Sequence, residues 1–168
     1  VTNDGQSLKL HRDLGLVNDV FKRAEFSKLT GFAAIGHVRK ASKDAGEVDN
    51  VQPLVFRSLS GSMAIAHNGD IKNARALQKE LENEGSILQT TSHTEVLAHL
   101  IKRHGQAVTE DAIIKALKKL NGAYAFLILT EDKMFIALDP QGIRPLSIGK
   151  LGDAYVVASE TCAFDIVG

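Results

Sequence analysis

The spacing of apolar residues along the chain predicts four helices. In residues 71–81, 93–101 and 109–120 an apolar residue recurs every three or four positions, which gives a helix one buried face. Residues 16–29 follow the same spacing more loosely. Start signals support three of the helices, because Asp70 would be an N-cap, Ser92 and Glu95 form a capping box, and acidic residues follow Thr109.

Apolar runs bounded by glycine, proline or acidic residues predict strands at 8–12, 32–38, 54–56, 63–66, 123–129, 134–138, 146–148 and 155–158. The run at 125–129 is almost entirely apolar, so we expect its sheet to be covered on both faces. Residues 40–53 are polar and rich in turn-forming residues, and predict a loop. Helices followed by closely spaced strands favour an α+β fold with antiparallel sheets.

Composition narrows the class of protein. The 168 residues suit one domain with a substantial core. The 20 basic and 20 acidic residues cancel, which argues against a nucleic-acid partner, since such a partner requires a basic surface. No apolar run reaches the length of about 18 residues that a membrane span needs, and the first residues do not form a signal peptide. The single cysteine excludes an internal disulfide and favours a cytoplasmic protein.

Both ends of the chain are predicted to be cuts through a longer protein. Val1 enters a turn at residues 3–5 as though a strand were already under way, and Gly168 ends just after an apolar segment. A missing first strand would expose the edge of a sheet, and we therefore expect self-association.

Four short motifs carry the chemistry. They are Gly-His-Val-Arg at 36–39, His-Asn-Gly-Asp at 67–70, Ser-His-Thr-Glu at 92–95 and Asp-Pro-Gln-Gly-Ile-Arg-Pro at 139–145. Their order and spacing resemble the glutaminase domain of class II glutamine amidotransferases, and within that family the bacterial amidophosphoribosyltransferases. The likeness runs from Gly15 to Ala163, essentially the whole chain, so residues 1–168 are assigned to one partial glutaminase domain. The segment 158–163 favours this branch over asparagine synthetase and glucosamine-phosphate synthase.

The resemblance implies a four-layer αββα sandwich of the N-terminal-nucleophile hydrolase type, here lacking its first strand. It also implies an activity, which is to release ammonia from glutamine for a phosphoribosyltransferase domain that these residues do not include. That domain would form 5-phosphoribosylamine from phosphoribosyl pyrophosphate in de novo purine synthesis. We expect glutamine and the missing domain as partners, and a homo-oligomer. No cofactor is expected in this chain, whereas Mg²⁺ and in some members an iron–sulfur cluster would belong to the missing domain.

The same resemblance suggests roles for individual residues. Asn68 and Gly69 would form the oxyanion pocket, through a side-chain amide and a backbone N–H. Arg39 would hold the α-carboxylate of glutamine, a task that suits a bidentate guanidinium. An aspartate normally receives the α-ammonium group at the position that His93 occupies here. The family nucleophile is an amino-terminal cysteine whose own α-amine serves as the base.

Two departures from the family pattern lead us to expect a catalytically incompetent chain. The chain begins at Val1, and Cys162 cannot replace the nucleophile because it has no free α-amine. A protonated His93 would repel an ammonium group. Lys40, where tyrosine is usual, adds to the departure. Two alternatives therefore stay open, which are a degenerate binding or assembly module and the glutaminase domain of another class II amidotransferase.

Simpler interpretations of the same residues also remain. Asn68-Gly69 could be a type I′ hairpin turn, and Arg39 an ordinary surface residue. His93 could serve mainly in the capping turn. A zinc site formed by His93, Glu95 and His99 is disfavoured, because Glu95 and His99 are simply i,i+4 neighbours on a helix.

Three further assignments concern structure alone. We expect His37 and His67 to be hydrogen-bonded core histidines and Cys162 to be a small buried apolar residue. Residues 139–145 would shape a turn in which Arg144 pairs with a carboxylate.

Overall fold

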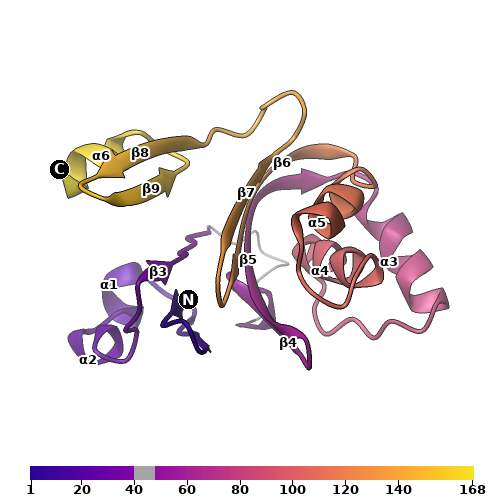
Figure 1. Cartoon of the computed structure of the whole chain (residues 1–168), viewed down its shortest axis with the longest axis horizontal. Coiled ribbons are helices and arrows are strands. Elements are labelled where there is room, and N and C mark those ends of the chain that lie inside the picture. The colour runs from indigo at the N-terminus through magenta and orange to yellow at the C-terminus, as the bar shows by residue number, and fades with distance from the viewer. Residues whose placement is uncertain (40–47) are drawn as a thin grey trace.

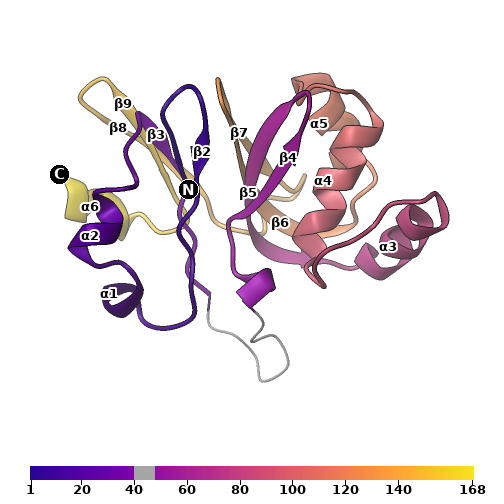
Figure 2. The same ribbon diagram turned by 90° about the horizontal axis from the view of Figure 1, so that it is seen from below.

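The computed structural model describes residues 1–39 and 48–168, and it has four layers. Figures 1 and 2 show helices on both outer sides and two layers of strands between them. This arrangement confirms the predicted αββα sandwich. Lys40 and most of the expected loop at 40–53 lie outside the described residues.

The larger strand layer is one antiparallel sheet of order β4-β5-β6-β7. Its strands are β4 (Leu54–Ser58), β5 (Gly61–Ile71), β6 (Gly122–Thr130) and β7 (Met134–Leu138). The two central strands pair over nine positions, from Met63 opposite Thr130 to Ile71 opposite Gly122. Nearly every residue of β6 from Tyr124 onward is buried whichever face it points to, which confirms that both faces of this sheet are covered.

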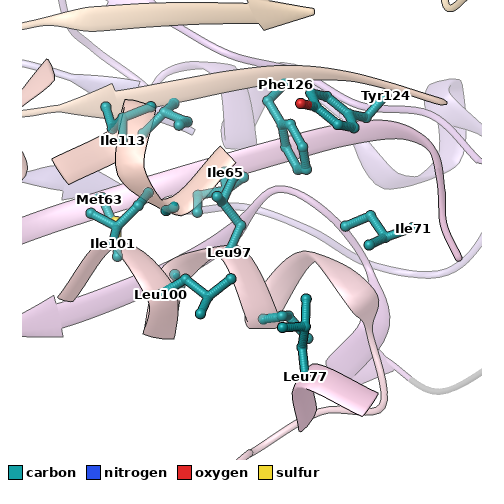
Figure 3. Packing of buried hydrophobic residues seen from close by; sticks show 14 of the residues in the cluster. Met63, Ile65, Ile71, Leu77, Leu97, Leu100, Ile101, Ile113, Tyr124 and Phe126 are labelled. Carbon is teal, nitrogen blue, oxygen red and sulfur yellow. The ribbon is translucent and has the colours of Figure 1, made fainter. Parts of the chain in front are cut away.

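Three helices cover one face of the sheet, namely α3 (Ala74–Asn83), α4 (His93–Arg103) and α5 (Glu110–Leu117). Figure 3 shows their apolar side chains, among them Leu97, Leu100 and Ile101, facing side chains of the strands. The predicted starts of α4 and α5 are confirmed, because the side chains of Ser92 and Thr109 accept hydrogen bonds from backbone N–H groups in the first turn.

The other face of the sheet is covered by shorter strands. β1 (Thr2–Asn3) lies between β2 (Leu8–Lys9) and β3 (Ala33–Ala34), and β8 (Ser147–Leu151) pairs with β9 (Ala154–Ala158). A second apolar cluster fills the space between the two strand layers, and Asn3 joins them by donating its side-chain Nδ2 to the carbonyls of Thr130 and Glu131 at 2.8 and 2.9 Å. The outer helices are α1 (Val17–Val20), α2 (Arg23–Phe26) and α6 (Cys162–Val167), and a 3₁₀ turn spans Val48–Asn50.

Several local predictions were wrong. The helix expected over 16–29 is two single turns, because the chain is extended at Lys22, and neither turn has a buried residue. The strand expected over 32–38 contains only Ala33 and Ala34, and Phe32 and Val38 are 72% and 76% exposed. Beyond Ile35 this segment leaves the sheet and lines a cleft instead of continuing in the ladder.

Two assignments of single residues also need correction. Asp70 does not cap α3 but lies within β5, and Asn73 stands at the N-cap without a side-chain bond. Cys162 is exposed rather than buried, because it begins the outermost helix and no further layer of the described chain covers it.

Candidate functional site

A cleft with a volume of about 620 Å³ lies at one end of the central sheet. It forms where the end of β5, the start of α4 and the segment after β3 come together. All four residues to which the sequence assigned roles line it, and the lining residues are Gly36, His37, Val38, Arg39, Asn50, Gln52, His67, Asn68, Gly69, Asp70, Thr91, Ser92, His93, Thr94 and Ser159.

The last part of β5 supplies the donors proposed for an oxyanion. Asn68 and Gly69 continue the ladder with β6, opposite Ala125 and Tyr124. The alternative that this Asn-Gly pair forms a hairpin turn is therefore wrong. Asn68 is exposed in the cleft although His67, directly before it on the strand, is buried.

Gly69 lies where the backbone approaches its neighbour too closely for any side chain. Its φ of +139° is rarely adopted by other residues. A Cβ at this position would overlap the carbonyl oxygen of Ala123 and come within 2.9 Å of the Cα of Tyr124. The glycine therefore allows β5 to remain paired with β6 right up to the cleft.

The first turn of α4 forms the opposite wall of the cleft. His93 is the first helical residue, directly after the capping Ser92, and its Nδ1 lies 3.5 Å from Oδ1 of Asp70. His93 therefore takes part in the capping turn and also faces the cleft. Arg39 is exposed on the segment after β3 and lines the same cleft.

Only half of the predicted capping box forms. Glu95 is 1% exposed, and its carboxylate accepts hydrogen bonds from the backbone N–H groups of Gln89 and Thr90 at 2.8 and 2.7 Å and from the Thr90 hydroxyl at 2.8 Å. It thus anchors the preceding loop instead of returning to Ser92. That loop carries Thr91, whose hydroxyl accepts a bond from Nδ2 of Asn50 at 2.9 Å across the cleft wall.

His67 forms the buried floor of the cleft. Its ring stacks on Phe126 with centroids 4.5 Å apart, and its Nδ1 lies 3.3 Å from the hydroxyl of Thr94. Burial, and to a smaller extent the nearby side chains of His37 and His93, lowers the pKa of His67 to about 4, so the ring is neutral near pH 7. Within the described residues its Nε2 has no hydrogen-bond partner, so the prediction of a fully bonded core histidine was wrong for this nitrogen.

His37 is partly buried at the edge of the cleft. Burial and the neighbouring Arg39 lower its pKa, which favours the neutral ring. The expectation of a core histidine is therefore only partly correct, since His37 lines the cleft.

Several polar residues of the cleft were given no role in binding on the basis of the sequence, among them Asn50, Gln52, Asp70, Thr91 and Ser159. Gln52 stabilises the strand end, since its Oε1 accepts a bond from the backbone N–H of His67 at 2.6 Å. Asn50 and Gln52 are both 7% exposed, although the sequence placed them in a polar loop. The sequence of a loop has no periodic pattern that would show which of its polar side chains are buried, so the burial of these two amides could not be predicted.

The turn after β7 is built around Asp139, as predicted for residues 139–145. Its carboxylate is 3% exposed and accepts bonds from the backbone N–H groups of Tyr124, Gln141 and Ile143 at 3.0–3.2 Å. The expected ion pair of Arg144 is not found in residues 1–39 and 48–168, where its buried Nε has no partner.

Neither a metal centre nor a membrane helix is found in the described part of the chain. No three or more histidine, cysteine, aspartate or glutamate side chains are grouped there in a way that could hold a metal ion. Of the helices described, none is both long and apolar enough to cross a bilayer.

Comparisons with known proteins agree with this geometry. The profile of the glutamine amidotransferase domain matches residues 37–165. Amidophosphoribosyltransferase of Bacillus subtilis is 59% identical over 169 residues, and that of a Staphylococcus aureus strain is 42% identical over 170 residues. Both alignments include 100% of this chain but only 36% and 34% of the relative, so the chain spans about a third of their length.

Two solved structures have the same fold. Glutamine phosphoribosylpyrophosphate amidotransferase from B. subtilis, complexed with ADP and GMP, superposes with a TM-score of 0.92 at 58% identity. A structure described as the allosteric regulatory enzyme of purine biosynthesis gives a TM-score of 0.95 at 59% identity. In each case the match includes 99% of this chain and 36% of the solved chain.

Proposed function

The chain belongs to the glutamine amidotransferase domain family, and on that premise we propose that its cleft binds glutamine for hydrolysis of the side-chain amide. The ammonia would serve an amidophosphoribosyltransferase reaction. The proposal rests on one observation. Three separate segments bring four residues to the lining of a single cleft, namely Arg39, Asn68, Gly69 and His93.

Arg39 binds the α-carboxylate of the amino acid. It is exposed in the cleft, where its guanidinium can donate two parallel hydrogen bonds to the α-carboxylate of glutamine. The neighbouring histidines, His37 and His67, are neutral near pH 7 because their pKa values are lowered. They therefore do not compete with Arg39 for the carboxylate.

Asn68 and Gly69 stabilise the negative charge that develops on the amide oxygen during hydrolysis. The side-chain amide of Asn68 and the backbone N–H of Gly69 are adjacent on a strand that the ladder with β6 holds in place. Donors fixed before the reaction need no reorganisation, and the loss of one such donor typically raises a barrier by about 2.7–4 kcal/mol.

The nucleophile is not among the described residues of the cleft. Cys162 is exposed on α6 and does not line it. We propose that the residues described here bind and polarise glutamine, whereas an amino-terminal cysteine of the kind the family uses performs the attack.

The remaining features of the proposed reaction concern the longer relatives. A phosphoribosyltransferase domain would take up the ammonia and form 5-phosphoribosylamine in the cytoplasm. Mg²⁺ would be bound by that domain. An iron–sulfur cluster, where present, would also be bound there, because the single cysteine of this chain cannot hold a cluster. A homo-oligomer remains part of this proposal.

Titration calorimetry with glutamine tests the binding step. We expect Arg39→Lys to weaken glutamine binding by roughly tenfold, since a lysine cannot form the bidentate pair. Arg75→Lys, on the exposed face of α3, is the matched control and should bind as the unmodified chain does. Failure of the unmodified chain to bind glutamine, or equal affinity in both variants, would contradict the proposal.

The alternative of a non-catalytic module makes a different prediction. It is favoured by His93, which by the resemblance stands at a position where the family uses an aspartate. Normal glutamine binding without release of glutamate, in a protein that also carries the amino-terminal cysteine, would support this alternative.

A further inference from the structure

The charges around the cleft suggest how it distinguishes an α-amino acid from a simple amide. A bound α-amino acid brings one carboxylate and one ammonium group. Among the described lining residues, Arg39 is the one guanidinium and Asp70 the one carboxylate. His37 and His67 add no charge near pH 7, because their pKa values are lowered.

Asp70 lies where it can contact the α-amino end of a ligand whose amide end is bound at Asn68. The two residues are two positions apart on β5, so their side chains leave the strand on the same face about 7 Å apart. That spacing is comparable to the length of glutamine from its amide to its α-amino group. The side chain of Asp70 is 67% exposed and therefore open to a ligand.

His93 occupies one side of the Asp70 carboxylate. Its Nδ1 lies 3.5 Å from Oδ1, which is longer than an ordinary hydrogen bond but close enough for the two groups to attract each other. With the proton on Nδ1, His93 attracts Oδ1 and leaves the second oxygen, Oδ2, to another donor. The His93 ring thus fixes the orientation of the carboxylate while the second oxygen stays available to a ligand.

We propose that Asp70 receives the α-ammonium group of the bound amino acid, and that His93 is a positioning residue that orients the Asp70 carboxylate. This proposal rests on the proposed function, since it assigns a residue of the same glutamine cleft. It also explains how the site can keep its recognition of the amino group although position 93 holds a histidine.

The test compares two ligands in calorimetric titrations of the full chain. Glutamine carries the α-ammonium group, and 4-carbamoylbutanoate is the same molecule without it. In the unmodified chain we expect glutamine to bind more tightly by about twofold to fivefold, a modest factor because the Asp70 carboxylate is largely exposed and screened.

Asp70→Asn keeps the shape of the side chain and removes its charge. We expect it to abolish the preference for glutamine while the affinity for 4-carbamoylbutanoate stays the same. Asp153→Asn, an exposed aspartate in the turn between β8 and β9, is the matched control and should keep the full preference. If Asp70→Asn retains the preference, or weakens both ligands equally, the proposal is overturned while the glutamine site stands.

The positioning role of His93 is tested by rescue. His93→Ala should reduce the preference for glutamine, and His93→Asn, whose side-chain amide can donate from nearly the same place as Nδ1, should restore it. Loss of the preference in both variants, or in neither, would refute the positioning role. Absence of any glutamine binding by the unmodified chain would instead refute the proposed function itself.

Discussion

Replacement of Gly69 by alanine tests whether the cleft depends on the close approach of β5 to β6. The added methyl group would overlap the carbonyl oxygen of Ala123, and the residue would have to keep a φ of +139°. An unfavourable backbone conformation costs about 1–3 kcal/mol, and overpacking a tight contact adds about 1–3 kcal/mol. We therefore expect Gly69→Ala to lower the free energy of unfolding by about 2–6 kcal/mol.

Gly85→Ala is the matched control for this change. Gly85 also has a positive φ, +91°, but a Cβ there meets no atom within 4 Å. Its substitution should cost only the conformational part, about 1–2 kcal/mol. Urea denaturation followed by circular dichroism measures both values, and calorimetry should show that Gly69→Ala alone also weakens glutamine binding. An equal loss of stability in the two variants would refute the steric argument.

Two further predictions concern buried ionisable groups. Because the pKa of His67 falls from 6.5 in the unfolded chain to about 4 in the folded one, stability is complete above pH 6.5 and declines as the pH drops to 4, by about 3 kcal/mol in all. His67→Gln should flatten this part of the stability profile in urea titrations at pH 7 and pH 4.5, and an unchanged slope would count against it. Glu95→Gln should cost about 2 kcal/mol or more in urea denaturation, because an amide cannot accept all the bonds from Gln89 and Thr90. The exposed Glu82→Gln should be neutral, and an equal cost in both would contradict this account.

The sequence predicted best those elements whose burial follows a simple pattern. The spacing of Leu97, Leu100 and Ile101 follows from packing one helix face against a core, and the solidly apolar run at 125–129 follows from burial on both faces of the sheet; the structure confirms both. The motif residues could also be identified, because their order along the chain resembles a known family. The structure brings Arg39, Asn68, Gly69 and His93 together on one cleft.

The errors arise where tertiary contacts override local pattern. Asn68-Gly69 has the composition of a tight turn, yet its pairing with β6 keeps it in a strand. Asp70 precedes a helical pattern, but the strand continues through it to Ile71. Glu95 has the position of a capping box, although its carboxylate finds stronger donors in the loop before it. No local sequence signal distinguishes these outcomes.

The length of β5 has a consequence for how this protein can change. Its beginning, at Met63 and Ile65, is packed inside the core, and its end presents Asn68 and Asp70 to the cleft without a hinge between them. A substitution that shifts the interior of the sheet by part of an ångström would therefore move the recognition groups by a similar amount. Under the proposed function, substitutions in the protein interior are therefore constrained by glutamine recognition, and engineering for heat resistance would have to preserve the strand register.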